Sequence, residues 1–348
     1  MRLPELLLEV YGAVVRVCCQ QQALLEEIRR DFSYFVCENT ARDTDFTVIG
    51  HLEEKRPQRP SLHHLLIKTK YLSCYDTGEI KYVFYGCNDY VECDYGKSTA
   101  NAYAADLSHL YELVYALLRS RIGELVERKG LCRVHALAFA VEEAGALFLA
   151  PTRGGKSTLA LALLREHPIM LLAEDAPFLD AHLNMHPFPL RVGIRPDGFQ
   201  PLSAEERACA RVVHNRKYGK KLLIDVDCFR AKLLHEPRQL CHVLIGRLPK
   251  NGQDGCIISR CSRLRLFAVL LMNLVVGVGV SQVKEYYLRR SLVDVCGKMH
   301  ILARRINIAV HIFFRRTPYL VRLSSDSEAN ARALMQFLTR QSPNVAQH

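Results

Sequence analysis

The residues with the clearest chemical meaning lie in segment 146–164, which has the sequence ALFLAPTRGGKSTLALALL. Two glycines precede a lysine in this segment, and a hydroxyl residue follows the lysine. In a phosphate-binding loop the backbone amides of such a turn surround phosphate oxygens, the lysine contacts the outer phosphates, and the hydroxyl binds Mg²⁺. The helix that follows presents its N-terminus to the same anion. We therefore predict a nucleotide-phosphate site formed by Ala150, Pro151, Thr152, Arg153, Gly154, Gly155, Lys156, Ser157 and Thr158.

This match has one departure from the usual loop pattern and one internal control. Ala150 stands where the pattern has its first glycine, and alanine is the smallest side chain that could still fit there. Segment 96–99 repeats the letters GKST, but it follows the polar run NDYVECDY instead of an apolar strand. We interpret that copy as a surface turn and helix cap. For 154–156 the alternative interpretation is a structural glycine turn.

Two adjacent acids, Glu174 and Asp175, end the apolar stretch that follows the expected loop helix. A carboxylate at the end of a strand beside a phosphate loop binds Mg²⁺ directly or through water. A second carboxylate could take a proton from an acceptor hydroxyl. Many motor-type ATPases have the order Asp-Glu, so the reversed order here argues against that class. Ordinary surface acids at a turn are the alternative.

His135 precedes the loop by 15 residues, on an expected strand over 132–141. A lone histidine on an apolar strand is either a buried structural residue or a functional group, and its position beside the loop keeps both interpretations open.

Five positive side chains lie within the eleven residues 211–221: Arg211, Arg216, Lys217, Lys220 and Lys221. They form either a solvated charged loop or a loop that closes over phosphates or an acidic acceptor. Aromatic residues are sparse there, so the stretch does not predict a nucleic-acid platform.

Secondary-structure patterns predict an α/β domain around these residues. Strands over 132–141, 146–150 and 169–173, with a helix over 157–166, indicate a βαβ unit. Further strands are expected at 188–194, 221–226, 242–246, 257–260, 309–314 and 319–323, with a helical region over 264–305 and a last helix from 326. Strands at 6–17, 47–49 and 82–85 and helices at 20–30 and 106–126 predict a smaller α+β domain. We expect two domains, 1–128 and 129–348.

The composition excludes several classes of protein. Hydrophobic residues make up 49% of the 348 and charged residues 24%, which argues against a largely disordered chain, and the net charge of +11 favours anionic partners such as nucleotides. The 13 cysteines include no C-x-x-C pair, so we expect buried thiols in place of a zinc site. The longest apolar run, 266–280, is shorter than the roughly 20 residues of a membrane span, which predicts a buried core helix. With no signal-peptide pattern at the N-terminus, we expect a cytoplasmic protein with no membrane partner.

Three motifs together resemble the HPr kinase/phosphorylase superfamily: Arg133-Val134-His135, the loop APTRGGKST and the acidic segment LLAED. The segment PFPLRVGIRP at 187–196 resembles the shorter HPr-kinase-related proteins of peptide-modification clusters. This resemblance implies a phosphoenolpyruvate-carboxykinase-like P-loop core that uses ATP and Mg²⁺. It also implies that Lys156 binds the β/γ-phosphates, that Ser157 and Glu174 bind Mg²⁺, that Asp175 is the base toward a serine hydroxyl, and that His135 braces the acidic pair.

Arg191 and Arg195 follow on the next expected strand, where they are either groups that neutralise transferred phosphate or ordinary exposed strand arginines. The family usually has two aspartates where this chain has Glu174 and Asp175, and its HPr-docking signature is not found, so HPr itself is not the expected acceptor.

Three functional hypotheses follow from the sequence. The first is an ATP- and Mg²⁺-dependent kinase acting on a serine of a peptide or small protein, such as a ribosomally made precursor peptide, or on a small metabolite. The second is a non-catalytic nucleotide-binding regulatory protein of the same fold. The third is phosphate-dependent dephosphorylation. None needs nucleic acid, and the oligomeric state is left open, with a homo-oligomer among the candidates.

Overall fold

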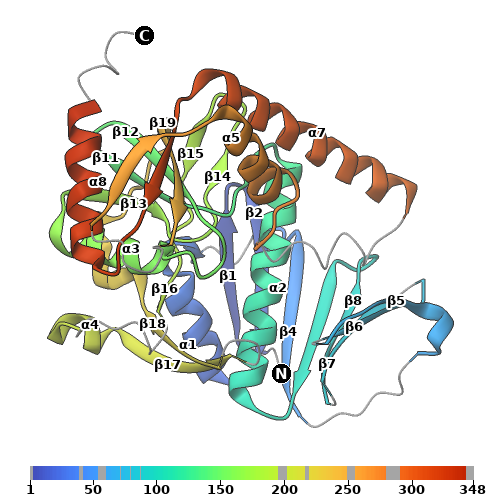
Figure 1. Cartoon of the computed structure of the whole chain (residues 1–348). Helices are drawn as coiled ribbons and strands as arrows, with labels where there is room; N and C mark the ends of the chain where they lie inside the picture. The colour runs from blue at the N-terminus through green and yellow to red at the C-terminus, as the bar shows by residue number, and fades with distance from the viewer. Residues whose placement is uncertain are drawn as a thin grey trace. The chain divides into compact units, whose positions relative to one another are not determined.

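The structure, a computed structural model, describes residues 3–38, 42–53, 60–70, 72–78, 80–86, 88–194, 202–215, 219–248, 255–279 and 291–341. The chain divides into two compact units. Unit 1 contains Met1–Lys129, Val213–Lys220 and Ser281–Met299, and unit 2 contains Gly130–Val212, Lys221–Val280 and His300–His348. Each large sheet is combined with helices, so the chain has a mixed α/β structure (Figure 1).

Unit 1 is built on a nine-stranded sheet with the order β3-β1-β2-β4-β9-β8-β7-β6-β5. The pairs β2-β4 and β4-β9 are parallel, and the other neighbours are antiparallel. The strands are β1 (Glu5–Val10), β2 (Ala13–Cys19), β3 (Val36–Cys37), β4 (Phe46–Leu52), β5 (Leu65–Lys68), β6 (Ser73–Asp76), β7 (Ile80–Tyr85), β8 (Asp89–Asp94) and β9 (Thr99–Ala104). Its helices are α1 (Gln22–Asp31) and α2 (Leu107–Arg128), with short 3₁₀ turns at Ser33–Phe35 and Leu62–His64.

Helix α2 covers one face of this sheet, where it packs on β2, β4, β8 and β9 (Figure 1). It begins at Asp106, whose side chain accepts hydrogen bonds from two backbone N–H groups of the first turn at 2.8 and 3.1 Å. Leu110, Val114 and Leu118 recur every four residues and are fully buried, so they form the apolar stripe that the helix presents to the sheet.

Unit 2 is built on a second sheet, in which β13-β11-β12-β19 are consecutive neighbours. Its strands are β10 (Cys132–Arg133), β11 (Leu137–Val141), β12 (Ala144–Leu149), β13 (Ile169–Ala173), β14 (Phe178–Leu179), β15 (Asn184–His186), β19 (Arg238–Arg247), β20 (Ile257–Arg260) and β21 (Pro318–Arg322). A small separate sheet has the order β16-β18-β17, formed by Val192–Ile194, Gly219–Ile224 and Ala210–Asn215. The helical segments are α3 (Lys156–Glu166), α4 (Ala204–Ala208), η4 (Val226–Lys232), α5 (Arg263–Leu270), the π turn η5 (Leu271–Val275), α7 (Leu292–Arg315) and α8 (Ser327–Gln341). The residues of α7 up to Met299 belong to unit 1.

Segment 150–155 lies between two strands that run in the same direction, β12 and β13. β11 is antiparallel to both β12 and β13, so β12 and β13 are parallel with β11 between them, and α3 connects them. β12 is also parallel to β19, and β19 to β21. The predicted order of strand, loop, helix and strand is therefore confirmed.

Helices pack on the sheet of unit 2 through apolar stripes. The segment α5, η5 and the second half of α7 contribute Leu266, Leu270, Leu274, Ile308 and Ile312 to the main core cluster. Helix α3 packs against α8, and the two lie side by side in Figure 1. Each fully buried leucine or isoleucine stabilises the fold by about 1.5–3 kcal/mol.

The described part of the apolar run, 266–279, is less buried than its sequence predicts. Leu266, Leu270 and Leu274 are buried, whereas Phe267 is 57% exposed and Met272 is 47% exposed. The expectation of a buried core helix is therefore correct for one stripe only, because a helix lying on a sheet buries one face. Among the residues that the structure describes, no helix is long and apolar enough to cross a membrane.

Three other elements differ from their sequence predictions. The expected strand over 6–17 is the hairpin β1-β2, whose turn at Tyr11-Gly12 has positive φ at both residues, 49° and 76°. Segment 309–314 lies inside α7, because Ile308 and Ile312, one helical turn apart, are both buried. Thr99 begins strand β9 and does not cap a helix.

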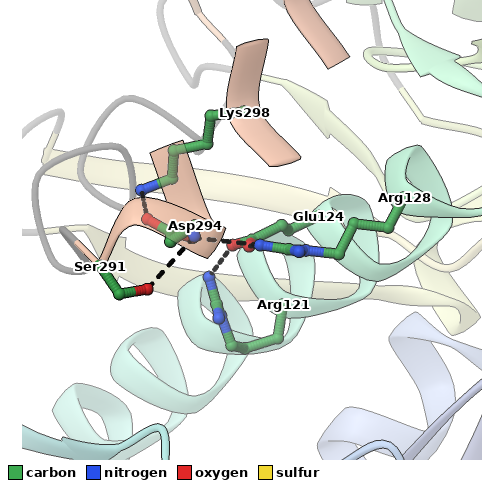
Figure 2. A network of polar contacts seen from close by, with 6 residues as sticks. All are labelled: Arg121, Glu124, Arg128, Ser291, Asp294 and Lys298. Carbon is green, nitrogen blue, oxygen red and sulfur yellow. Dashed lines mark hydrogen bonds and ion pairs between the residues drawn. The ribbon is translucent and has the colours of Figure 1, made fainter. Parts of the chain in front are cut away.

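A network of charged side chains joins α2 to the first turns of α7 inside unit 1 (Figure 2). Glu124 Oε1 accepts hydrogen bonds from Arg128 Nη2 at 2.7 Å and Nε at 3.1 Å, and Oε2 contacts Arg121. The fully buried side chain of Asp294 lies 3.1 Å from Arg128 and 2.7 Å from Lys298. Burial raises the pKa of Glu124, but the charges of Arg121, Arg128 and Lys298 oppose it and lower the pKa to about 2.

Candidate functional site

The predicted phosphate loop lies between β12 and α3, entirely within unit 2. Pro151, Thr152 and Arg153 are exposed, and Arg153 has the unusual φ of 66°. A Cβ on Gly154 would lie 2.7 Å from the Pro151 carbonyl oxygen, which already accepts the Gly154 N–H at 2.9 Å. No larger residue fits at 154 while the turn keeps this shape. The tight turn ends at Gly155, which adopts φ 84° as the N-cap of α3.

Lys156 is the first residue of α3, and its side chain is buried. The ammonium group contacts two backbone carbonyl oxygens and one histidine nitrogen. Nζ donates hydrogen bonds to the carbonyl oxygens of Ala150 at 2.8 Å and Pro151 at 3.3 Å, and lies 3.0 Å from His135 Nε2. Burial lowers the pKa of Lys156, and the negative charges of Asp175 and Glu174 oppose that shift. The loop thus holds the lysine through its own carbonyl groups in this state.

His135 lies in a break between two strands, which corrects the prediction of one strand over 132–141. β10 ends at Arg133 and β11 begins at Leu137. In the break, His135 N–H donates to the Asn273 carbonyl at 3.0 Å, and Ala136 N–H donates to the Asp175 carbonyl at 3.0 Å. The strand is interrupted because these backbone groups bond to segments outside the ladder.

Asp175, His135 and Lys156 lie in a row. His135 Nδ1 is 3.1 Å from Asp175 Oδ1 but makes no hydrogen bond within the described residues, while its Nε2 lies at hydrogen-bond distance, 3.0 Å, from Lys156 Nζ. A protonated lysine has no acceptor atom, so Nε2 must accept and the ring proton is assigned to Nδ1, the nitrogen nearer the carboxylate. The imidazole is 5% exposed and Asp175 is 31% exposed, so the carboxylate is the member of the row that an external group can reach.

Ser157 and Glu174 form the second contact of the site. The Ser157 hydroxyl donates to Glu174 Oε1. Burial and the neighbouring Asp175 charge raise the pKa of Glu174, against the opposing effects of Lys221, Ser157 and Lys156. A cation bound beside this carboxylate would offset the cost of its burial.

This pair suits Mg²⁺ by its chemistry. Magnesium prefers oxygen ligands, and it is usually held by one or two carboxylates with waters and substrate phosphates completing the coordination. Within the described parts of the chain, no group of three or more His, Cys, Asp or Glu side chains could hold a metal ion by itself. The Ser157 hydroxyl and the Glu174 carboxylate are the oxygen ligands that this contact could offer to such an ion.

The structure describes only some of the remaining predicted residues. Thr158 is exposed in the first turn of α3, and Arg191 is half-buried just before β16. Lys221 of β18 is near enough to influence Glu174 electrostatically, and its side chain passes over Gly193 of β16. Arg195, Arg216 and Lys217 lie outside the described residues. The basic stretch therefore places Lys221 near the site, although its sequence alone did not distinguish Lys221 from its neighbours.

The second GKST copy has a different structure. Segment 95–98 is a turn between β8 and β9, and Lys97 is 81% exposed with Asp94 3.3 Å away. No helix begins at Lys97 to direct its N-terminus at an anion. The flanking apolar strand and the helix, rather than the four letters, thus distinguish the two copies.

No protein-family model matches the chain, and no curated protein matches it.

Proposed function

We propose that this protein is an ATP- and Mg²⁺-dependent kinase that transfers the γ-phosphoryl group to a serine hydroxyl of a peptide or small protein. It would be an HPr-kinase-related enzyme with a phosphoenolpyruvate-carboxykinase-like P-loop core. The observation that carries the proposal is the convergence of Lys156, Ser157, Glu174 and Asp175 around the N-terminus of α3, with His135 lying between Lys156 and Asp175.

Each group has a role in this reaction. The α3 N-terminus and Lys156 would bind the phosphates, and Mg²⁺ held by Ser157 and Glu174 would neutralise charge on the nucleotide. Asp175 would accept the proton of the serine hydroxyl while the serine oxygen bonds to the γ-phosphorus. The bond from that phosphorus to the β–γ bridging oxygen breaks, giving phosphoserine and ADP.

The contacts of the Lys156 ammonium favour a second candidate function, that of a nucleotide-binding regulatory protein without transfer activity. Its ammonium has three hydrogens, and Ala150 O, Pro151 O and His135 Nε2 provide three acceptors within 3.3 Å. Nucleotide phosphates would have to replace these acceptors. A protein that uses such a replacement as a signal would need no catalytic base.

The experiment that separates the two candidates is phosphoryl transfer from γ-labelled ATP to a panel of serine-containing peptides, with Mg²⁺ and the purified full chain. Wild type should label at least one peptide on serine. Asp175→Asn should keep nucleotide affinity within about threefold and lose at least about 100-fold in transfer, as expected for a general base. Lys156→Ala should lose both nucleotide binding and phosphoryl transfer.

The chain provides its own control in the second GKST copy. Lys97→Ala removes the lysine of the same four letters from an exposed turn, and both binding and transfer should stay at the wild-type level. Transfer by Asp175→Asn at the wild-type rate would refute the assignment of the base. Nucleotide binding that depends on Lys156, with no labelled peptide, would favour the regulatory candidate.

A further inference from the structure

A segment far along the chain, the π turn η5 and the residues after it, contacts His135 from outside the strand break. Asn273, inside η5, accepts the His135 N–H through its carbonyl at 3.0 Å. Gly279 lies four residues after η5, with φ 96°. A Cβ built on Gly279 would lie 2.6 Å from Cδ2 and Nε2 of His135 and 2.9 Å from Cε1.

The wide turn explains why the Asn273 carbonyl is available to His135. In an α-helix this carbonyl would accept the N–H of the residue four positions later. Here the Val276 N–H bonds to the Leu271 carbonyl at 2.8 Å, and the Val278 N–H bonds to the Met272 carbonyl at 2.8 Å. These bonds span five and six residues, and such widened turns often occur at functional sites.

From these contacts we infer that Gly279 is a positioning residue, whose lack of a side chain lets the His135 imidazole lie between Lys156 and Asp175. The inferred role in rate rests on the proposed kinase function, whereas the inferred role in placing the ring does not.

The argument depends on whether the ring could move aside. His135 is buried, its Nε2 lies 3.0 Å from Lys156 Nζ, and its Nδ1 lies 3.1 Å from Asp175. Ordinary van der Waals contact begins at 3.4 Å, so a methyl carbon on Gly279 would be about 0.8 Å too close to His135 Nε2. The ring would have to move away from Lys156, because the obstructed atoms include Nε2, the nitrogen that contacts the lysine. A displacement near 1 Å at a reacting centre lowers a rate by up to about 100-fold.

The test compares Gly279→Ala with Gly255→Ala. Gly255 also lies in unit 2 and has φ 80°, but a Cβ there meets nothing within 4 Å, so this control imposes similar backbone strain without obstructing a ring. Gly279→Ala should lower kcat for peptide phosphorylation by about 10- to 100-fold and change KM for ATP by less than threefold. Gly255→Ala should keep both values within twofold of wild type.

A double-mutant cycle shows whether the effect acts through the ring. In a His135→Ala background there is no imidazole to displace. Adding Gly279→Ala to that background should therefore change kcat by less than twofold. The decrease in Tm that Gly279→Ala causes should also become as small as the decrease caused by Gly255→Ala. A full additional loss in that background would overturn the inference. If Gly279→Ala alone does not fold, recovery of folding in the double variant would support the inference, and failure of the double variant to fold would refute it.

A measurement that needs no kinase activity completes the test. Spectra of ¹⁵N-histidine-labelled protein, with the His135 signals identified by their loss in His135→Ala, should show shifted ring nitrogens in Gly279→Ala and unshifted ones in Gly255→Ala. Unshifted His135 signals in Gly279→Ala would overturn the inference. If the wild type transfers no phosphate but the His135 signals still shift in Gly279→Ala, the proposed function would be refuted and the role of Gly279 would be supported.

Discussion

Glu124 provides the prediction whose magnitude is set most directly by the structure. Its carboxylate is 12% exposed and is bonded to Arg128 and Arg121 in the network of Figure 2. Burial raises the pKa of Glu124, but the nearby positive charges outweigh burial and lower this pKa from 4.5 to about 2. A difference of that size between folded and unfolded states corresponds to about 3 kcal/mol of stability at neutral pH. Glu124→Gln should therefore lower the free energy of unfolding of unit 1 by about 3 kcal/mol at pH 7.

The sign of the pH dependence follows from the lowered pKa. A carboxylate with a depressed pKa stabilises the fold fully above its unfolded value, near 4.5, and loses that contribution as the pH falls toward 2. The difference between wild type and Glu124→Gln should thus be constant above about pH 5.5 and should shrink steadily below pH 4.5.

Urea unfolding measures this difference without adding salt that would screen the charges. The chain has no tryptophan, so a Tyr34→Trp reporter placed in both proteins gives fluorescence from unit 1 alone. Glu27→Gln is the control: this residue is 33% exposed and 3.5 Å from Arg30, an exposed pair for which about 0.5 kcal/mol or less is expected. A loss below about 1 kcal/mol for Glu124→Gln, or a loss equally large at pH 7 and pH 3, would refute the reasoning.

Three further predictions concern other single contacts. Gly154→Ala should weaken nucleotide binding at least tenfold by calorimetry, because its Cβ would lie 2.7 Å from the Pro151 carbonyl; unchanged affinity would mean that the loop does not hold the phosphates. Ser157→Ala should raise the Mg²⁺ concentration needed for nucleotide binding, and an unchanged Mg²⁺ titration would remove Ser157 from the metal site. Tyr111→Phe should destabilise unit 1 in urea by about 1–3 kcal/mol, because its hydroxyl donates to the fully buried Asp31 at 2.5 Å; a loss below about 0.5 kcal/mol would show that Asp31 is satisfied by other groups.

The sequence predicted the parts of the site that depend on local pattern. Glycines before a lysine, an apolar strand in front and a helical stripe behind indicate the strand, turn and helix that the structure shows over β12 and α3. The acids after β13 could be placed near the loop because β12 and β13 run in the same direction.

The parts that could not be predicted depend on distant groups. The break at His135 is stabilised by carbonyls of Asp175 and Asn273, and no pattern near residue 135 encodes a hydrogen bond to residue 273. Gly279 gives no motif, because its importance lies in the ring it faces. Segment 309–314 was predicted as a strand because its β-branched and aromatic residues favour strands, whereas burial of Ile308 and Ile312 favours the continued helix.

The contacts of Lys156 also affect how fast a nucleotide could bind. While the ammonium donates to the carbonyls of its own loop, those oxygens compete within the molecule with any incoming phosphate. If release of the lysine is slow, the observed association rate should reach a plateau as the nucleotide concentration rises, since the plateau equals the release rate. The apparent affinity would equal the intrinsic affinity multiplied by the fraction of molecules with the lysine released. A substitution that weakens the hold of the loop on its lysine could therefore tighten binding without adding any contact to the nucleotide.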